Sequence, residues 1–83
     1  FSAYPVPFRE TLNIEYDFDY SSSATIQMFD TQGRLLRTYQ EANAYKGKVT
    51  ELNIDFRTRA SQVYILKVTT DRDVFTKKII SDK

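Results

Sequence analysis

The stretch Leu12-Asn13-Ile14-Glu15-Tyr16-Asp17-Phe18-Asp19 decides the fold, because every second residue in it is large and apolar. Successive side chains of a β-strand point to opposite faces of the sheet, so this alternation predicts a strand that is buried on one face and wet on the other. The buried face is expected to carry Leu12, Ile14, Tyr16 and Phe18.

The same period of two continues on the C-terminal side of this stretch. Further strands are expected at residues 24–29, 35–39, 49–56, 63–70 and 74–80, with a short seventh at residues 1–4. In the strand at residues 49–56, Thr50, Leu52, Ile54 and Phe56 are expected to face one way. The last has mixed faces, with Phe75 and Ile79 on one side and Val74 and Ile80 on the other. Only residues 40–44 suggest a helix, and weakly.

Turn residues separate the strands. Gly33, in Asp30-Thr31-Gln32-Gly33, is able to take the positive φ of a tight turn. In Thr70-Asp71-Arg72-Asp73 the Asp side chains suit a turn by bonding the nearby main chain. Six to seven strands at spacings of about ten residues predict an all-β fold, an antiparallel immunoglobulin-like sandwich in a single domain.

The alternation also predicts which side chains form the core. They are Leu12, Ile14, Tyr16, Ile26, Met28, Leu52, Ile54, Tyr64, Leu66 and Val68.

Composition excludes several classes of function. The chain has 12 basic and 11 acidic residues, a net charge of +1, which gives no field to attract nucleic acid. No apolar run is long enough for a membrane-spanning helix. Histidine and cysteine are absent, so the usual general base, catalytic triads and the commonest metal ligands are missing. No enzyme activity and no cofactor are therefore expected.

Three minor alternatives remain open from the residues. Glu15, Asp17, Asp19 and Asp30 are close in sequence and could form a carboxylate pair, although alternation places the first three on the solvated face. The Asp-x-Asp pairs at residues 17–19 and 71–73 are fragments of a calcium loop without the required glycine. Exposed rings could stack on sugar, and the candidates are Phe29, Tyr39, Tyr45 and Phe75.

Three segments, in this order, resemble the C-terminal sorting domains of the bacterial type IX secretion system. The first is Tyr4-Pro5-Val6-Pro7-Phe8, followed by the alternating stretch; its prolines suit an extended segment that does not continue as a central strand. The second runs from Ile26 to the turn with Asp30, Gly33 and Arg34, where Gly33 is required by geometry and Arg34 is expected to be a solvated charge. The third is the Tyr64-bearing strand, a turn, and Val74-Phe75-Thr76-Lys77-Lys78-Ile79-Ile80.

The resemblance implies that residues 1–83 are a single C-terminal sorting domain of a longer secreted protein. Consistent with this expectation, the sequence begins at Phe1 without an initiator Met or a signal peptide. The attached cargo would cross the periplasm, be recognised by the type IX translocon and reach the surface or the medium, and in many members a surface sortase removes the domain.

Recognition is expected to use the last strand, through its open edge or its lysines. The residues are Val74, Phe75, Lys77, Lys78, Ile79, Ile80 and Lys83. Without the family, the lysines would be explained as edge charges that prevent aggregation. An open edge also predicts dimerisation by strand exchange. The alternative function is an immunoglobulin-like or fibronectin-like spacer, or a carbohydrate-binding module, of an extracellular enzyme.

Overall fold

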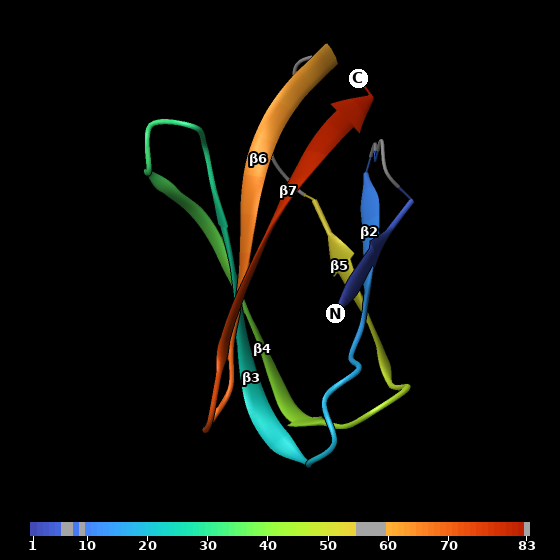
Figure 1. The fold of residues 1–83 in the computed structure, drawn as a ribbon. Helices are drawn as coiled ribbons and strands as arrows, with labels where there is room; N and C mark the ends of the chain where they lie inside the picture. The colour runs from blue at the N-terminus through green and yellow to red at the C-terminus, as the bar shows by residue number, and fades with distance from the viewer. Residues whose placement is uncertain (6–7, 9, 55–59, 83) are drawn as a thin grey trace.

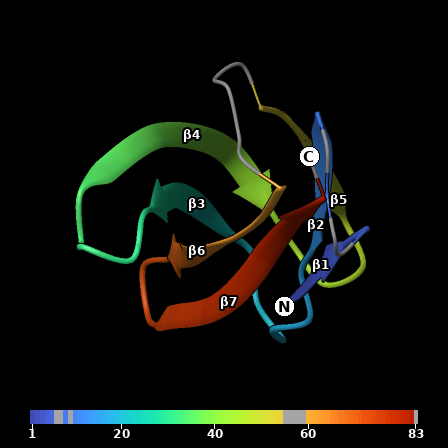
Figure 2. The same cartoon turned by 90° about the horizontal axis from the view of Figure 1, so that it is seen from above.

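The computed structural model describes residues 1–5, 8, 10–54 and 60–82, and it is all-β over these residues. The strands are β1 (Ser2–Tyr4), β2 (Thr11–Glu15), β3 (Ser22–Phe29), β4 (Leu35–Ala44), β5 (Val49–Asn53), β6 (Ala60–Thr69) and β7 (Val74–Asp82). They form two antiparallel sheets packed as a sandwich, in strand order β1-β2-β5 and β4-β3-β6-β7. The two layers are visible in Figure 1 and, from above, in Figure 2.

The strand order is immunoglobulin-like. β2 pairs with β5 in one sheet and β3 pairs with β6 in the other, so the chain crosses between the sheets after β2, β4 and β5, as in a Greek-key sandwich. β4 joins β3 rather than β5, which makes the second sheet four-stranded. The predicted sandwich and its short first strand are confirmed.

The core lies between the sheets and contains every residue expected there. In β3 the side chains of Ala24, Ile26 and Met28 are buried, while Thr25, Gln27 and Phe29 alternate with them on the far side. We call that far side, which faces away from the three-stranded sheet, the outer face of the four-stranded sheet. The core also includes Phe8, Phe18, Ala44 and Ile79, the first of which sits at the end of the proline-containing segment.

Several strand boundaries differ from expectation. β2 ends at Glu15, although Tyr16 and Phe18 remain buried beyond it. β5 ends at Asn53, and the expected inward position of Phe56 lies outside the described residues. The expected Phe75 and Ile79 face of β7 points to the core, and the strand continues to Asp82.

The weak helical signal at residues 40–44 does not produce a helix. These residues are the second half of β4, in register with β3 from Gln40 opposite Thr25 to Ala44 opposite Ser22. Gln, Glu and Ala favour helix locally, but the hydrogen bonds of a sheet edge and the burial of Ala44 outweigh that preference.

Candidate functional site

Strand β7 forms one edge of the four-stranded sheet. Its partner over the whole length is β6, with Val68 opposite Phe75, Leu66 opposite Lys77 and Tyr64 opposite Ile79. In Figure 1 the red strand runs along the rim of its layer toward the C-terminal end. β7 therefore has one side that is paired and one side that faces out of the sheet.

Two hydrogen bonds establish which main-chain groups of β7 face outward. At the turn, the N–H of Thr70 donates to the carbonyl of Asp73 at 2.9 Å, and at the far end the carbonyl of Ile80 accepts from the N–H of Phe8 at 3.0 Å. In an antiparallel ladder, residues alternate between bonding the neighbouring strand and pointing away from it. The main-chain groups of Thr76 and Lys78 thus point away from β6, as those of Ile80 do.

The outward edge is divided into a covered end and an open stretch. Phe8 forms a parallel bridge with Ser81, so the segment at residue 8 covers the end of β7. From Val74 to Lys78, no described residue pairs with the outward edge. An unpaired row of N–H and C=O groups is the surface to which another strand adds.

The two adjacent lysines of β7 lie on opposite faces of the sheet. Lys77 is on the core side, where its Nζ lies 5.4 Å from the centroid of the Phe1 ring. Lys78 is exposed on the outer face, opposite Ile65 of β6. Lys77 therefore has a contact within the domain, while Lys78 is presented outward.

The other expected recognition residues divide in the same way. Phe75 packs against the core and Ile79 is buried, whereas Val74 and Ile80 are 58% and 41% exposed on the outer face. Lys83 lies outside the described residues. Among the described residues of this set, Ile79 is buried, while Val74, Lys77, Lys78 and Ile80 are exposed and Phe75 is partly buried.

The turn of the hairpin is held by the segment before β3. The Tyr20 hydroxyl bonds the carboxylate of Asp73 and, at 2.9 Å, the hydroxyl of Thr70, and the guanidinium of Arg72 lies 4.7 Å from the Tyr20 ring centroid. Thr70, rather than an Asp as expected, bonds the turn's main chain, since its hydroxyl accepts from the N–H groups of Arg72 and Asp73. An aromatic stack of Tyr20, Phe18 and Phe75 continues this contact into the core. The hairpin is thus fixed to the opposite layer.

The turn between β3 and β4 is organised by the buried carboxylate of Asp30. It accepts from the main-chain N–H groups of Gln32 and Arg34, both at 2.9 Å, and from Nε of Arg34 at 2.7 Å. The main-chain bond from Arg34, with its guanidinium and the Gln32 N–H, lowers the pKa of Asp30 below its ordinary value, although burial opposes this shift. The Arg34 side chain is exposed, as expected of a solvated charge, and its Nε also donates to the Asp30 carboxylate across the turn.

Gly33 in this turn has φ +85°, as its position in the turn predicts. No atom lies within 4 Å of where a Cβ would stand, so the glycine is required by its backbone conformation and not by crowding.

The N-terminal segment and the Tyr64 strand meet in the core. The rings of Phe8 and Tyr64 lie 5.9 Å apart and both side chains are buried. Tyr4 is partly exposed at the end of β1 and the Tyr4–Pro5 peptide bond is cis, while Pro7 lies outside the described residues. Sequence reasoning missed the burial of Phe8, for which its size and apolarity were the available signal.

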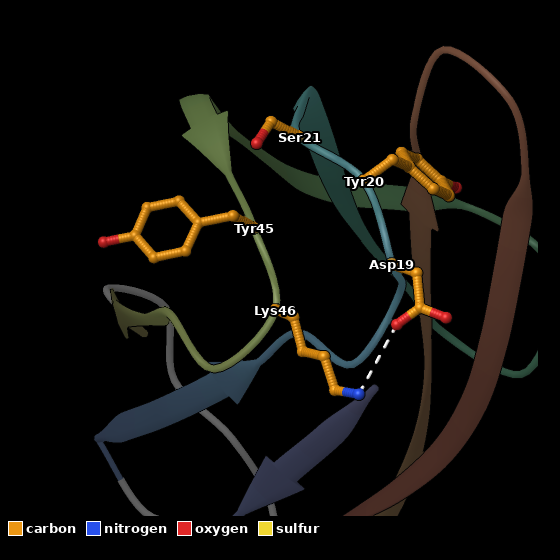
Figure 3. A pocket seen from close by; sticks show the side chains of 5 residues that line it. All are labelled: Asp19, Tyr20, Ser21, Tyr45 and Lys46. Atoms are coloured by element: carbon orange, nitrogen blue, oxygen red, sulfur yellow. Dashed lines mark hydrogen bonds and ion pairs between the residues drawn. The ribbon is translucent and has the colours of Figure 1, made fainter.

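Figure 3 shows a shallow hollow of about 330 Å³, lined by Asp19, Tyr20, Ser21, Tyr45 and Lys46. The rings of Tyr20 and Tyr45 point in different directions, and an ion pair of 3.4 Å joins Lys46 to Asp19. Lys48 lies over the Tyr45 ring, and Tyr20 is stacked on Phe18. The hollow therefore offers no open ring platform for a sugar.

The other sugar and metal candidates have ordinary surroundings. Tyr39 and Phe75 pack against the core, and Phe29 is half-buried on the outer face. Glu15, Asp17 and Asp19 are exposed, as alternation predicts. Over the described residues no three acidic side chains gather closely enough to hold a metal ion, and no helix there is long and apolar enough to cross a bilayer.

Comparison with known proteins identifies the family. The family described as "Secretion system C-terminal sorting domain" matches residues 2–82, which include all seven strands. No curated protein and no solved structure gives a significant match. The matched family is a transport signal and not a catalytic family, in agreement with the sequence resemblance. The chain belongs to the secretion system C-terminal sorting domain family, the signals that direct attached proteins out of the cell through the type IX secretion system.

Proposed function

We propose that the type IX machinery recognises this domain by adding a strand to the open stretch of β7, from Val74 to Lys78. The observation that carries the proposal is the outward direction of the Thr76 and Lys78 main-chain groups, which no described residue pairs. In strand addition the main-chain hydrogen bonds supply affinity, and the side chains beside them supply specificity.

Lys78 is the second part of the proposed contact. Lysine on an edge strand discourages pairing between identical copies, because like charges meet. A partner strand with carboxylates turns the same charge into an attraction and selects for that partner. Lys83, outside the described residues, is proposed to extend this charge toward the end of the chain.

The transport route follows from the family. A sorting domain acts on cargo in the same polypeptide, which passes through the periplasm and is delivered to the cell surface or beyond. We further propose that residues 1–83 are one domain of a longer secreted protein, that the domain has no catalytic activity, and that a surface sortase removes it after export.

A single proline substitution in β7 tests strand addition. Thr76→Pro removes an N–H that points to the open edge, but leaves the bonds to β6 in place because residue 76 does not face β6. With a periplasm-targeted reporter fused to the chain, Thr76→Pro is expected to trap the reporter in the periplasm. Thr76→Val, which keeps the N–H, is the matched control and is expected to export normally.

Lys78 is tested separately from the edge. Lys78→Ala is expected to lower the surface fraction of the reporter with no change in thermal unfolding, whereas Lys77→Ala acts only through its contact in the domain. Normal export of a folded Thr76→Pro fusion would exclude strand addition at this edge.

Strand exchange between copies uses the same edge. We propose that the isolated domain dimerises through β7 only weakly and at high concentration, because the Lys78 side chains of the two copies repel each other, and that Thr76→Pro prevents it. Sedimentation of the wild-type domain as monomer only at millimolar concentration would contradict this.

A further inference from the structure

The outer face of the four-stranded sheet carries an apolar stripe across all four strands. Leu35 of β4 is opposite Phe29 of β3, which is opposite Ile65 of β6. Val63, two residues before Ile65, is opposite Ile80 of β7. Leu35 and Ile80 are 50% and 41% exposed, and the other three are partly exposed. Adjacent positions in register are close neighbours, so these five side chains form one surface.

The charges beside this stripe have one sign. Lys67 of β6 and Lys78 of β7 lie on the same face, with Lys78 directly opposite Ile65, and neither forms an ion pair with a described residue. The remaining outward positions in register on β3 and β4 are Thr25, Gln27, Thr38 and Gln40. Between Val74 and Ile80, and at the positions of β6, β3 and β4 in register with them, no outward residue carries a carboxylate. Asp82, opposite Ala60, lies beyond this stretch at the end of β7.

The stripe is set apart from the attached cargo. In both views the N-terminus lies with the three-stranded layer (Figures 1 and 2). The N-terminus and the outer face are therefore on opposite sides of the four-stranded sheet. The connection to a preceding cargo domain thus leaves from the other side of the sandwich. The cargo is not the natural occupant of this face.

Two other occupants fit the charges poorly. A second copy applied face to face would bring the Lys67 and Lys78 side chains of both copies into the same contact, where like charges repel. Binding to an anionic lipid surface typically uses a cluster of roughly four to eight basic residues, and this face has two among uncharged Thr and Gln side chains.

We infer that the outer face docks a protein partner that presents apolar side chains bordered by carboxylates. The inference rests on the sorting function proposed above and adds to it a second contact with the machinery, separate from the open edge of β7. Exposed apolar patches bordered by polar residues mark interaction sites, and complementary charge sets the partner and the rate of encounter. One face would then give specificity and the neighbouring edge would give the strand pairing.

The test uses the cargo-fused chain in cells that have the type IX machinery, with substitutions outside β7. Leu35→Thr combined with Lys67→Glu removes an apolar residue and reverses a charge on the face. Val49→Thr combined with Lys46→Glu is the matched control in the other half of the molecule, where Val49 is 44% exposed and Lys46 is exposed. The face variant is expected to slow export about tenfold, and the control less than about twofold. Thermal unfolding of both should match the wild type.

A photoreactive residue at position 35 identifies the occupant during export. The expected product is a cross-link between the chain and an acidic segment of a machinery protein. Lys67→Glu is expected to lower the yield of this cross-link, and changing a carboxylate of that segment to lysine is expected to restore it. Cross-linking to lipid or lipopolysaccharide, or to a second copy, overturns the inference.

The same experiments separate this inference from the proposed function. If Thr76→Pro blocks export while the face variant exports normally, the docking face is refuted and strand addition stands. If the wild-type fusion itself stays in the periplasm, both are refuted.

Discussion

Phe8 donates its main-chain N–H to the carbonyl oxygen of Ile80 at 3.0 Å, and thereby joins the N-terminal segment to the last strand. Its ring is fully buried beside Tyr64, on the strand that pairs with β7. Two segments that the sequence resemblance treats as separate signatures are therefore one structural unit. The covered end of β7 is therefore formed by a residue more than seventy positions before it.

Truncating this ring is expected to destabilise the domain strongly. Phe8→Ala removes a fully buried aromatic ring, a change that costs about 3–5 kcal/mol, against a total of about 5–15 kcal/mol for a typical domain. Urea unfolding followed by circular dichroism measures the loss. Tyr4→Ala, at a partly exposed ring on β1, is the control and is expected to cost much less. Equal losses for the two would show that Phe8 is not part of the core.

The Asp30 carboxylate predicts a pH dependence of stability. Its pKa is lowered in the folded state, so the unfolded chain binds more protons and acid favours unfolding. The stabilisation is complete above the unfolded pKa of about 4 and is lost as the pH falls through the lower folded value. Asp30→Asn should remove this part of the slope of unfolding free energy below about pH 4.

Asp71→Asn is the matched control for that measurement, because Asp71 is exposed on the β6–β7 turn. If both variants keep the wild-type slope, the Asp30 turn does not couple folding to protons.

Gly33 tests the cost of backbone conformation without a steric clash. At φ +85°, Gly33→Ala is expected to lower the free energy of unfolding by about 1–2 kcal/mol, because an L-residue is strained there although its Cβ meets nothing. Gly33→Asn should cost less, since Asn tolerates this region better. Thermal melts of the three proteins give the order, and an Ala variant as stable as the wild type would contradict it.

A chain of hydrogen bonds from Tyr16 through Thr50 to Glu41, here called the hydroxyl relay, joins the two sheets. A double-mutant cycle can test it. Tyr16 donates to Thr50 at 2.8 Å, and Thr50 donates to the carboxylate of Glu41 at 2.9 Å. Thr50→Val should cost about 1–3 kcal/mol because it leaves the Tyr16 hydroxyl without its acceptor, whereas Tyr16→Phe should cost about 0.5–1.5 kcal/mol. Denaturant unfolding of both single variants and the double variant measures the coupling. Additive losses would show that the relay does not act as a unit.

Alternation was sufficient to predict the sandwich. Leu12, Ile14 and Tyr16, like Tyr64, Leu66 and Val68, are buried as expected, because the period of a strand is two wherever one of its faces meets a core. The same rule could have separated Lys77 from Lys78, since neighbours in a strand point to opposite faces. The sequence prediction treated Lys77 and Lys78 together as two basic residues and so did not separate their faces.

The remaining features depend on contacts between distant segments. Residues 40–44 resemble a helix by composition, and only pairing with β3 makes them a strand. The burial of Phe8 and its hydrogen bond to Ile80 depend on how the N-terminal segment packs against β7. No local sequence pattern predicts that contact. The hairpin contacts of Tyr20 with Thr70 and Asp73 likewise join residues about fifty apart.

Under the strand addition proposed above, recognition requires the folded domain, because the bond between Phe8 and Ile80 and the pairing with β6 together define the open edge of β7. A peptide that copies residues 74–82 has neither β6 on one side nor the covered end on the other, so it does not present the same edge. An incompletely folded or misfolded domain would likewise not be bound by a partner that recognises that edge. Only chains whose sorting domain has folded would then be exported, so the signal would also act as a check on folding.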